Sequence, residues 1–216
     1  MATTWNPVDS SPNIGTNIGT FSPDLLSYSY DSPIDGFFAI IHGNLAISTG
    51  RYQFEYLITN TAEPTAGNPN IGIARPGDPV APLSFANFVG VTPNAWGLFS
   101  SGNVWNNNNP VAPSIATFGI GDIIGVLVDA TVGTLWFTKN GISSNGVPGN
   151  SGGWTIATGV QWLPAASFLG QQSAPNTPDA GTANFAGPFA FPVTGFAPWT
   201  IPPPLGSPKL QPYWYS

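Results

Sequence analysis

The chain has 216 residues, of which 42% are apolar and only 6% are charged, and its formal net charge is −6. The 4 cations are too few and too scattered to form a phosphate-binding or polybasic membrane patch, and the absence of cysteine excludes disulfides and thiolate metal sites. The 26 Gly and 24 Pro residues interrupt helices, so the composition predicts one all-β domain of short strands and turns.

The N-terminal stretch Thr4–Asp9 places one tryptophan, Trp5, among turn-forming residues. We expect Trp5 to cover the core of the domain rather than to form a ligand platform. The first thirteen residues lack the basic and apolar regions of a signal peptide, and no apolar run is long enough to span a membrane. Neither secretion nor membrane insertion is therefore expected.

The next strand candidates are Phe21–Tyr30, Gly36–Ser48 and, most clearly, Gly50–Thr59. In the last of these, Tyr52, Phe54, Tyr56 and Ile58 alternate with Arg51, Gln53, Glu55 and Leu57, as in a half-buried strand. His42 has no carboxylate or second histidine nearby in the sequence, so we interpret it as structural. Glu55 is also expected to be structural, either paired with Arg51 or Arg75 or accepting hydrogen bonds from backbone N–H groups.

Further strands are predicted at Ile71–Ala74 and Ala95–Ser100. Four connections are polar or broken by proline and are expected to carry recognition. They are Asn60–Asn70, Arg75–Asn94, Asn103–Pro110 and Ile142–Gly153. In the third, Trp105 and Asn107 are candidate partner-binding residues that could bind sugar hydroxyls; the alternative is a solvated turn with an inward tryptophan.

The centre of the chain predicts an antiparallel hairpin. Ile123–Val128 is a short apolar strand, and Asp129–Gly133 supplies turn-forming residues. In the following strand, Leu135 and Phe137 lie on one face and are expected in the core, while Thr134, Trp136 and Thr138 lie on the other. Strands are also predicted at Trp154–Thr158 and Val160–Phe168.

This hairpin resembles the signature of the SPRY domain. The residues that carry the resemblance are Gly121, Asp122, Ile124, Gly125, Asp129, Gly133, Thr134, Leu135, Phe137, Asn140 and Gly141. The stretch 182–196 resembles the closing motif of the same family, with Ala186 and Gly187 as mild departures, and Thr4–Asp9 resembles the start of SPRY-like proteins encoded by bacteriophages. The resemblance implies a two-sheet antiparallel β-sandwich, a concanavalin-like jelly roll, over residues 1–196, with binding loops at one end.

The remaining segment, residues 197–216, is predicted to be an extended C-terminal arm. Its six prolines exclude a helix and favour polyproline II conformation. It also carries Tyr213, Trp214 and Tyr215, which are too apolar to remain in water and are candidate anchors on a neighbouring subunit or on the arm's own domain.

No chemistry of an enzyme is evident. No strand carries two acids on one face, and no nucleophile motif, paired histidines or phosphate-binding glycine loop is present. We therefore expect no cofactor, no metal and no nucleic-acid partner. The leading hypothesis is a non-enzymatic structural protein of a bacteriophage virion, a capsid decoration or tail component that binds other virion proteins or copies of itself. The alternatives are a module that binds carbohydrates such as surface glycans or a receptor, and a cellular adaptor that binds peptides.

Overall fold

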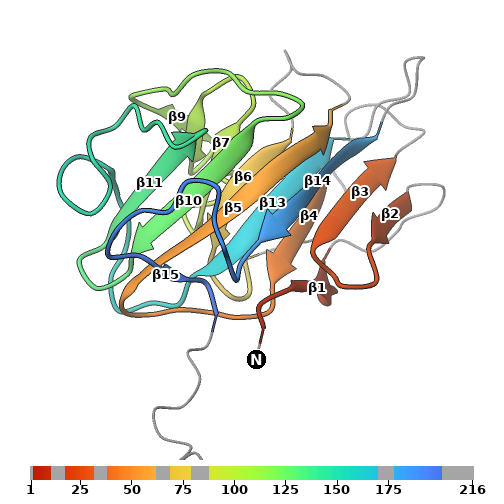
Figure 1. Ribbon diagram of the computed structural model, residues 1–216, viewed down its shortest axis with the longest axis horizontal. Coiled ribbons are helices and arrows are strands. Elements are labelled where there is room, and N and C mark those ends of the chain that lie inside the picture. The colour runs from red at the N-terminus through yellow and green to blue at the C-terminus, as the bar shows by residue number, and fades with distance from the viewer. Residues whose placement is uncertain are drawn as a thin grey trace, which may run out of the picture.

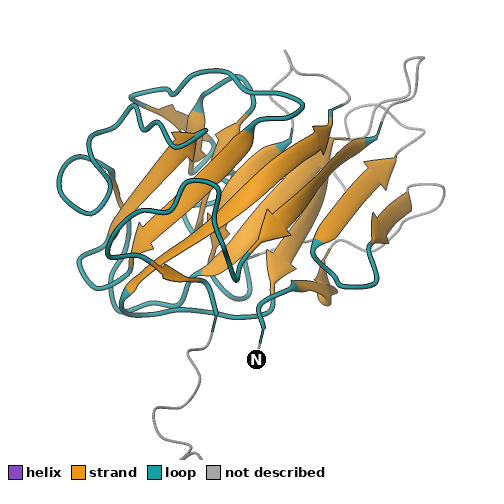
Figure 2. Cartoon of the chain, viewed as in Figure 1, coloured by secondary structure: helices purple, strands orange, loops and turns teal. Residues whose placement is uncertain are grey.

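The computed structural model describes residues 2–10, 18–31, 38–61, 69–78, 88–169 and 178–200. Every regular element in this part of the chain is a strand, and the strands form two sheets packed face to face (Figure 2). The predicted all-β, two-sheet antiparallel sandwich is confirmed. In the same residues there is no helix that could cross a membrane.

The first sheet has seven strands in the order β1-β4-β13-β6-β7-β8-β9. The strands are β1 (Trp5–Ser10), β4 (Phe38–Gly43), β13 (Leu163–Leu169), β6 (Asn70–Ala74), β7 (Ala95–Phe99), β8 (Val104–Asn106) and β9 (Asn109–Val111). Because β13, from late in the chain, lies between β4 and β6 from its first half, this sheet depends on contacts between residues far apart in the sequence (Figure 1).

The second sheet has eight strands. Seven of them follow the order β12-β11-β10-β5-β14-β3-β2, and β15 pairs with β5 in parallel orientation. The strands are β12 (Trp154–Thr155), β11 (Thr134–Lys139), β10 (Ile123–Asp129), β5 (Arg51–Asn60), β14 (Asp179–Asn184), β3 (Ser27–Asp31), β2 (Ile18–Phe21) and β15 (Ala197–Pro198). The long strand β5 lies at the centre, between β10 and β14.

The predicted hairpin is β10 and β11, with Val126 opposite Phe137 and Val128 opposite Leu135. Leu135 and Phe137 are fully buried between the sheets, as expected. Asp129 shapes the connecting turn: its Oδ1 accepts hydrogen bonds from the N–H groups of Thr131 and Val132, both at 3.1 Å. The local sequence therefore determines both the turn and the register of this pair.

The core between the sheets contains several large aromatic side chains. Trp5 is fully buried, lies edge-on to Phe185 with ring centroids 5.1 Å apart, and donates its indole N–H to the Leu26 carbonyl at 2.9 Å. The expectation that Trp5 covers the core is confirmed. Its polar atom is satisfied by backbone, so the ring is buried without an unpaired donor.

The start of the predicted C-terminal arm belongs to the sandwich. Trp199 is fully buried, edge-on to Phe54 at 5.6 Å, and donates its indole N–H to the Leu45 carbonyl at 3.0 Å. The proposed boundary at residue 196 therefore precedes a residue that packs in the core. Tyr213, Trp214 and Tyr215 lie outside the described residues, and the arm beyond residue 200 stays a prediction.

Candidate functional site

The outer face of the eight-stranded sheet is partly covered by residues 188–196, which we call the covering segment. In Figure 1 this segment follows β14 and lies in front of β5 and β10. Glu55 on β5 holds it: one carboxylate oxygen accepts the Ala190 N–H at 2.8 Å and the other accepts the Phe191 N–H at 2.7 Å. Glu55 is only 4% exposed, so both carboxylate oxygens are used to attach the segment.

Gln53 provides the second attachment. Its side-chain nitrogen donates to the Phe191 carbonyl at 3.0 Å, and its side-chain oxygen accepts the Val193 N–H at 3.0 Å. Backbone groups that are removed from water need such partners. Of the roles considered for Glu55, acceptance of backbone N–H groups is therefore the correct one. Arg51 instead pairs with Asp129, at 2.6 Å.

The covering segment changes the environment of β11. The sequence predicted a half-buried strand with Trp136 and Thr138 on its outer face, but both side chains are 3% exposed. Phe196 lies edge-on to Trp136, with ring centroids 6.0 Å apart, and the Trp136 indole donates to the Ser151 carbonyl at 3.1 Å. Chain segments distant in sequence thus bury a face that the alternating pattern assigns to solvent.

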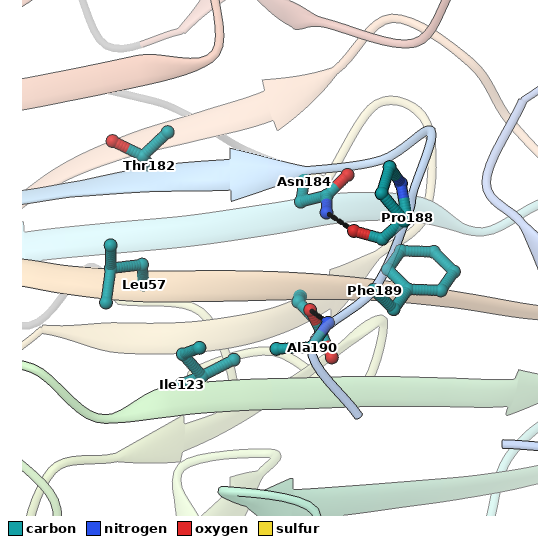
Figure 3. Close-up of a pocket in the computed structure, with 8 residues that line it drawn as sticks. Leu57, Ile123, Thr182, Asn184, Pro188, Phe189 and Ala190 are labelled. Atoms are coloured by element: carbon teal, nitrogen blue, oxygen red, sulfur yellow. Dashed lines mark hydrogen bonds between the residues drawn. The ribbon is translucent and has the colours of Figure 1, made fainter. Parts of the chain in front are cut away.

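Beyond the edge of the covering segment the sheet is open and forms a groove. Thr182 on β14, Leu57 on β5 and Ile123 on β10 are direct neighbours across the strands and form its floor. The wall is residues 188–190, and the pocket encloses about 360 Å³ (Figure 3). This volume lies within the range of about 300–1,000 Å³ typical of ligand sites.

The wall of the groove is built by a tight turn after β14. Asn184 accepts the Gly187 N–H at 2.8 Å and donates to the Pro188 carbonyl at 2.8 Å, as the dashed line in Figure 3 shows for Pro188. Gly187 has a φ of +73°, which favours glycine. The departure from the family motif at residue 187 therefore supplies the backbone conformation that this turn requires.

The chemistry of the groove is that of a binding surface. Leu57 is 38% exposed, and Ile123, Pro188 and Phe189 extend the apolar lining. Glu55 is the single ionisable residue among those that line the groove, and both its oxygens are engaged by backbone N–H groups. Because no free acid, base or nucleophile faces the space, the groove is suited to hold apolar side chains.

The residues predicted for partner binding lie elsewhere. Trp105 is on β8 of the other sheet, where it packs against Phe88 and Phe99 with ring centroids 5.5 Å apart in both cases. Asn107 is exposed in the turn to β9, with a φ of 51°, and its N–H donates to the Thr92 carbonyl at 3.1 Å. The structure does not bring these two residues to the groove, and their role in binding stays a prediction.

A second group of ionisable residues lies at the end of the seven-stranded sheet. His42 on β4 is buried, and Asp78 is close enough for the charges to interact, although the sequence showed no carboxylate near His42. Burial raises the pKa of Asp78, and the Thr92 hydroxyl, which donates to Asp78 at 2.5 Å, partly opposes this effect. Among the described residues, no cluster of three or more His, Cys, Asp or Glu side chains is placed to hold a metal ion.

The polar residues of the central signature have structural roles. Asp122 accepts the side-chain N–H of Asn140 at 2.7 Å and pairs with Lys139 at 3.0 Å, and Asn140 in turn accepts the Ile123 N–H at 2.8 Å. These contacts join the start of β10 to the end of β11. Gly133, with a φ of +76°, leaves no room for a side chain, because a Cβ would lie 2.5 Å from the Ile156 carbonyl oxygen. The signature thus describes how the hairpin folds.

Comparison with known proteins agrees with this geometry. Residues 51–151 match the family model of the SPRY domain. This match covers just under half of the chain. The crystal structure of the SPRY domain of human HERC1 shares the fold, with a TM-score of 0.60 and 17% identity over 83% of this chain and 96% of that chain. No curated protein matches the sequence. The comparisons provide no evidence of a bacteriophage origin, so that part of the sequence interpretation remains a proposal.

The groove was not predicted from the sequence, although a signal for it exists. On β5 the outward positions are Arg51, Gln53, Glu55 and Leu57, so Leu57 is an apolar residue on an otherwise polar face. Ile123 is a second such residue, directly beside Leu57 in the sheet. Recognising that the two are neighbours required the pairing of β5 with β10, which the local sequence does not specify.

Proposed function

We propose that this protein is a non-catalytic protein–protein interaction module, in which the groove on the eight-stranded sheet binds an extended apolar segment of a partner. SPRY domains are generally interaction modules without catalytic activity. The observation that carries the proposal is the pair of neighbouring apolar residues on the groove floor, exposed Leu57 and half-buried Ile123, bordered by a wall that Glu55 and Asn184 hold in place. Such a preformed apolar site binds without first ordering its own residues.

The proposed setting is a bacteriophage particle, in which the module serves as a capsid decoration or tail component. Two features of the sequence support this setting: the opening Thr4–Asp9, which resembles SPRY-like bacteriophage proteins, and a surface with few charges. Mass spectrometry of gradient-purified particles from the virus that encodes the chain tests it. The protein is expected at a fixed copy number per particle, and its absence from intact particles would contradict this setting.

The groove itself is tested by selecting peptides from a random library with the wild-type protein. Selected peptides should be rich in aromatic and aliphatic residues. We expect Leu57→Glu to weaken their binding at least about tenfold, because it places a charge on the apolar floor. Ile142→Glu is the matched control, since Ile142 is 74% exposed and does not line the groove. Peptides that bind Leu57→Glu as tightly as wild type would place recognition elsewhere.

A further inference from the structure

The described chain ends at Thr200, beside the sheet that carries the groove. Ala197 lies opposite Tyr52 on β5, and the Trp199 N–H donates to the Gln53 carbonyl at 3.1 Å. The groove floor at Leu57 is four residues farther along the same strand. At about 3.3 Å per residue, this is a distance of about 13 Å.

The chain that follows, residues 201–216, lies outside the described residues, but its sequence constrains what it can reach. Prolines stand at positions 202–204, 208 and 212, and such segments favour an extended conformation of about 3.1 Å per residue. Tyr213 is thirteen residues beyond Thr200, so an extended tail places it about 40 Å away. This is about three times the distance of about 13 Å between Gln53 and Leu57, so a tail that stayed extended would reach past the groove of its own chain to the groove of a neighbouring copy.

The tail and the groove also match chemically. Lys209 is the one charged residue in 201–216, whereas Tyr213, Trp214 and Tyr215 are three consecutive aromatic residues. The groove offers an apolar floor with the Thr182 hydroxyl at its edge, and the carboxylate of Glu55 is already engaged. Aromatic rings with polar atoms suit such a site, because the ring is buried while the hydroxyl or indole N–H remains near water.

We propose that the groove of one copy binds the Tyr213–Tyr215 end of the tail of a second copy. The proposal rests on the proposed function, because it names the partner of the same groove. Donor and acceptor lie on different parts of the surface, so the contact is heterologous. Contacts of this kind link copies into closed rings or open filaments. The groove proposed above to bind a partner would thus link copies of the chain to one another.

The test uses three full-length proteins examined by size-exclusion chromatography with light scattering. The first is wild type. The second carries Leu57→Glu, which disables the groove and keeps the tail. The third carries Tyr213→Ser, Trp214→Ser and Tyr215→Ser together, which disables the tail and keeps the groove. We expect wild type to form oligomers and each variant alone to be a monomer, while the control Ile142→Glu assembles like wild type.

Mixing the two variants provides the decisive measurement. The intact tail of the Leu57→Glu protein can enter the intact groove of the triple-serine protein. The groove and the tail that remain free in this complex both carry substitutions, so no third copy can be added. An equimolar heterodimer is therefore expected, and no larger species. Circular dichroism and thermal melting of each variant establish that it is folded, and Ile123→Glu serves as a second groove variant if Leu57→Glu is not.

Several results would overturn the proposal. The first is a monomeric wild type, which would result if the tail folds back at Gly206 onto its own groove. The second is assembly of either variant like wild type. The third is failure of the mixed variants to form a heterodimer. The outcome for the proposed function is separate. If library peptides bind in a way that depends on Leu57 but the tail does not bind the groove, the groove is an interaction site whose partner is another protein.

Discussion

Glu55 offers a direct test of how the covering segment is attached. The substitution Glu55→Gln preserves the shape of the side chain but replaces one acceptor oxygen with an NH2 group. One of the two backbone donors, at Ala190 or Phe191, then faces another donor. A hydrogen bond to a charged group contributes about 1.5–3 kcal/mol, and an unsatisfied buried donor costs about 1–3 kcal/mol.

Since Gln keeps one bond and no longer buries a charge, we expect a net loss of about 2–3 kcal/mol in the free energy that holds residues 188–196 on the sheet. At about 1.4 kcal/mol per factor of ten, this loss increases the opened population of the covering segment by about 30- to 150-fold. Hydrogen–deuterium exchange of the amides of Ala190, Phe191 and Val193 measures this population directly.

The control for this experiment is Asp24→Asn, the same change from acid to amide in an exposed turn that lies outside the covering segment. It should leave the exchange of residues 188–196 unchanged. If Glu55→Gln exchanges these amides at the wild-type rate, the two short hydrogen bonds do not hold the segment, and our explanation of the buried Glu55 is wrong.

Four other measurements test the structure. Phe137→Ala should lower the free energy of unfolding by about 3–5 kcal/mol in denaturant titrations, because the ring is fully buried; a loss under about 1 kcal/mol would mean an outward-facing strand. Trp199→Ala should cost a similar amount, about 3–5 kcal/mol, and wild-type stability would mean that the sandwich closes without residues 197–200. Burial alone would raise the pKa of Asp122, but hydrogen bonds from Gly119 and Asn140 and the nearby Lys139 lower it overall. The stability that the ionised Asp122 contributes to the fold is therefore present above about pH 4 and is lost as the pH falls through the lowered pKa. Asp122→Asn should therefore lose less stability than wild type on acidification, and parallel acid unfolding curves would argue against this role. Finally, Trp105→Ala with Asn107→Ala should weaken partner binding if the β8–β9 turn takes part in recognition, and unchanged binding of every detected partner would exclude that turn.

The two sheets share one way of covering their outer faces. On the seven-stranded sheet, the backbone of Val89 is held by Asn70, which donates to its carbonyl at 2.7 Å, and by Ser167, whose hydroxyl accepts its N–H at 3.2 Å. Gly97 permits this close approach, because a Cβ there would lie 1.9 Å from the Val89 carbonyl oxygen. In both sheets, therefore, buried polar side chains on the strands mark where a loop backbone is bound.

The sequence was informative wherever the structure is local. Strands β10 and β11, their turn at Asp129 and the burial of Leu135 and Phe137 all follow from alternation and turn chemistry over about twenty residues. The high content of glycine and proline likewise predicts short strands in place of helices. These features depend on the conformational preferences of neighbouring residues, which are present in the sequence itself.

Tertiary structure decided which outward faces are covered and where a groove remains. The alternating pattern distinguishes two faces of a strand, but burial of the outer face depends on segments that arrive from far along the chain. Trp136 is covered by residues near 151 and 196, Glu55 meets the backbone of residues 190 and 191, and Trp199 completes the core beside β5. Leu57 stays exposed and Ile123 half-buried because the covering segment ends before it reaches them. Period-two alternation contains no information about such long-range contacts, so the site emerges only when the chain is folded.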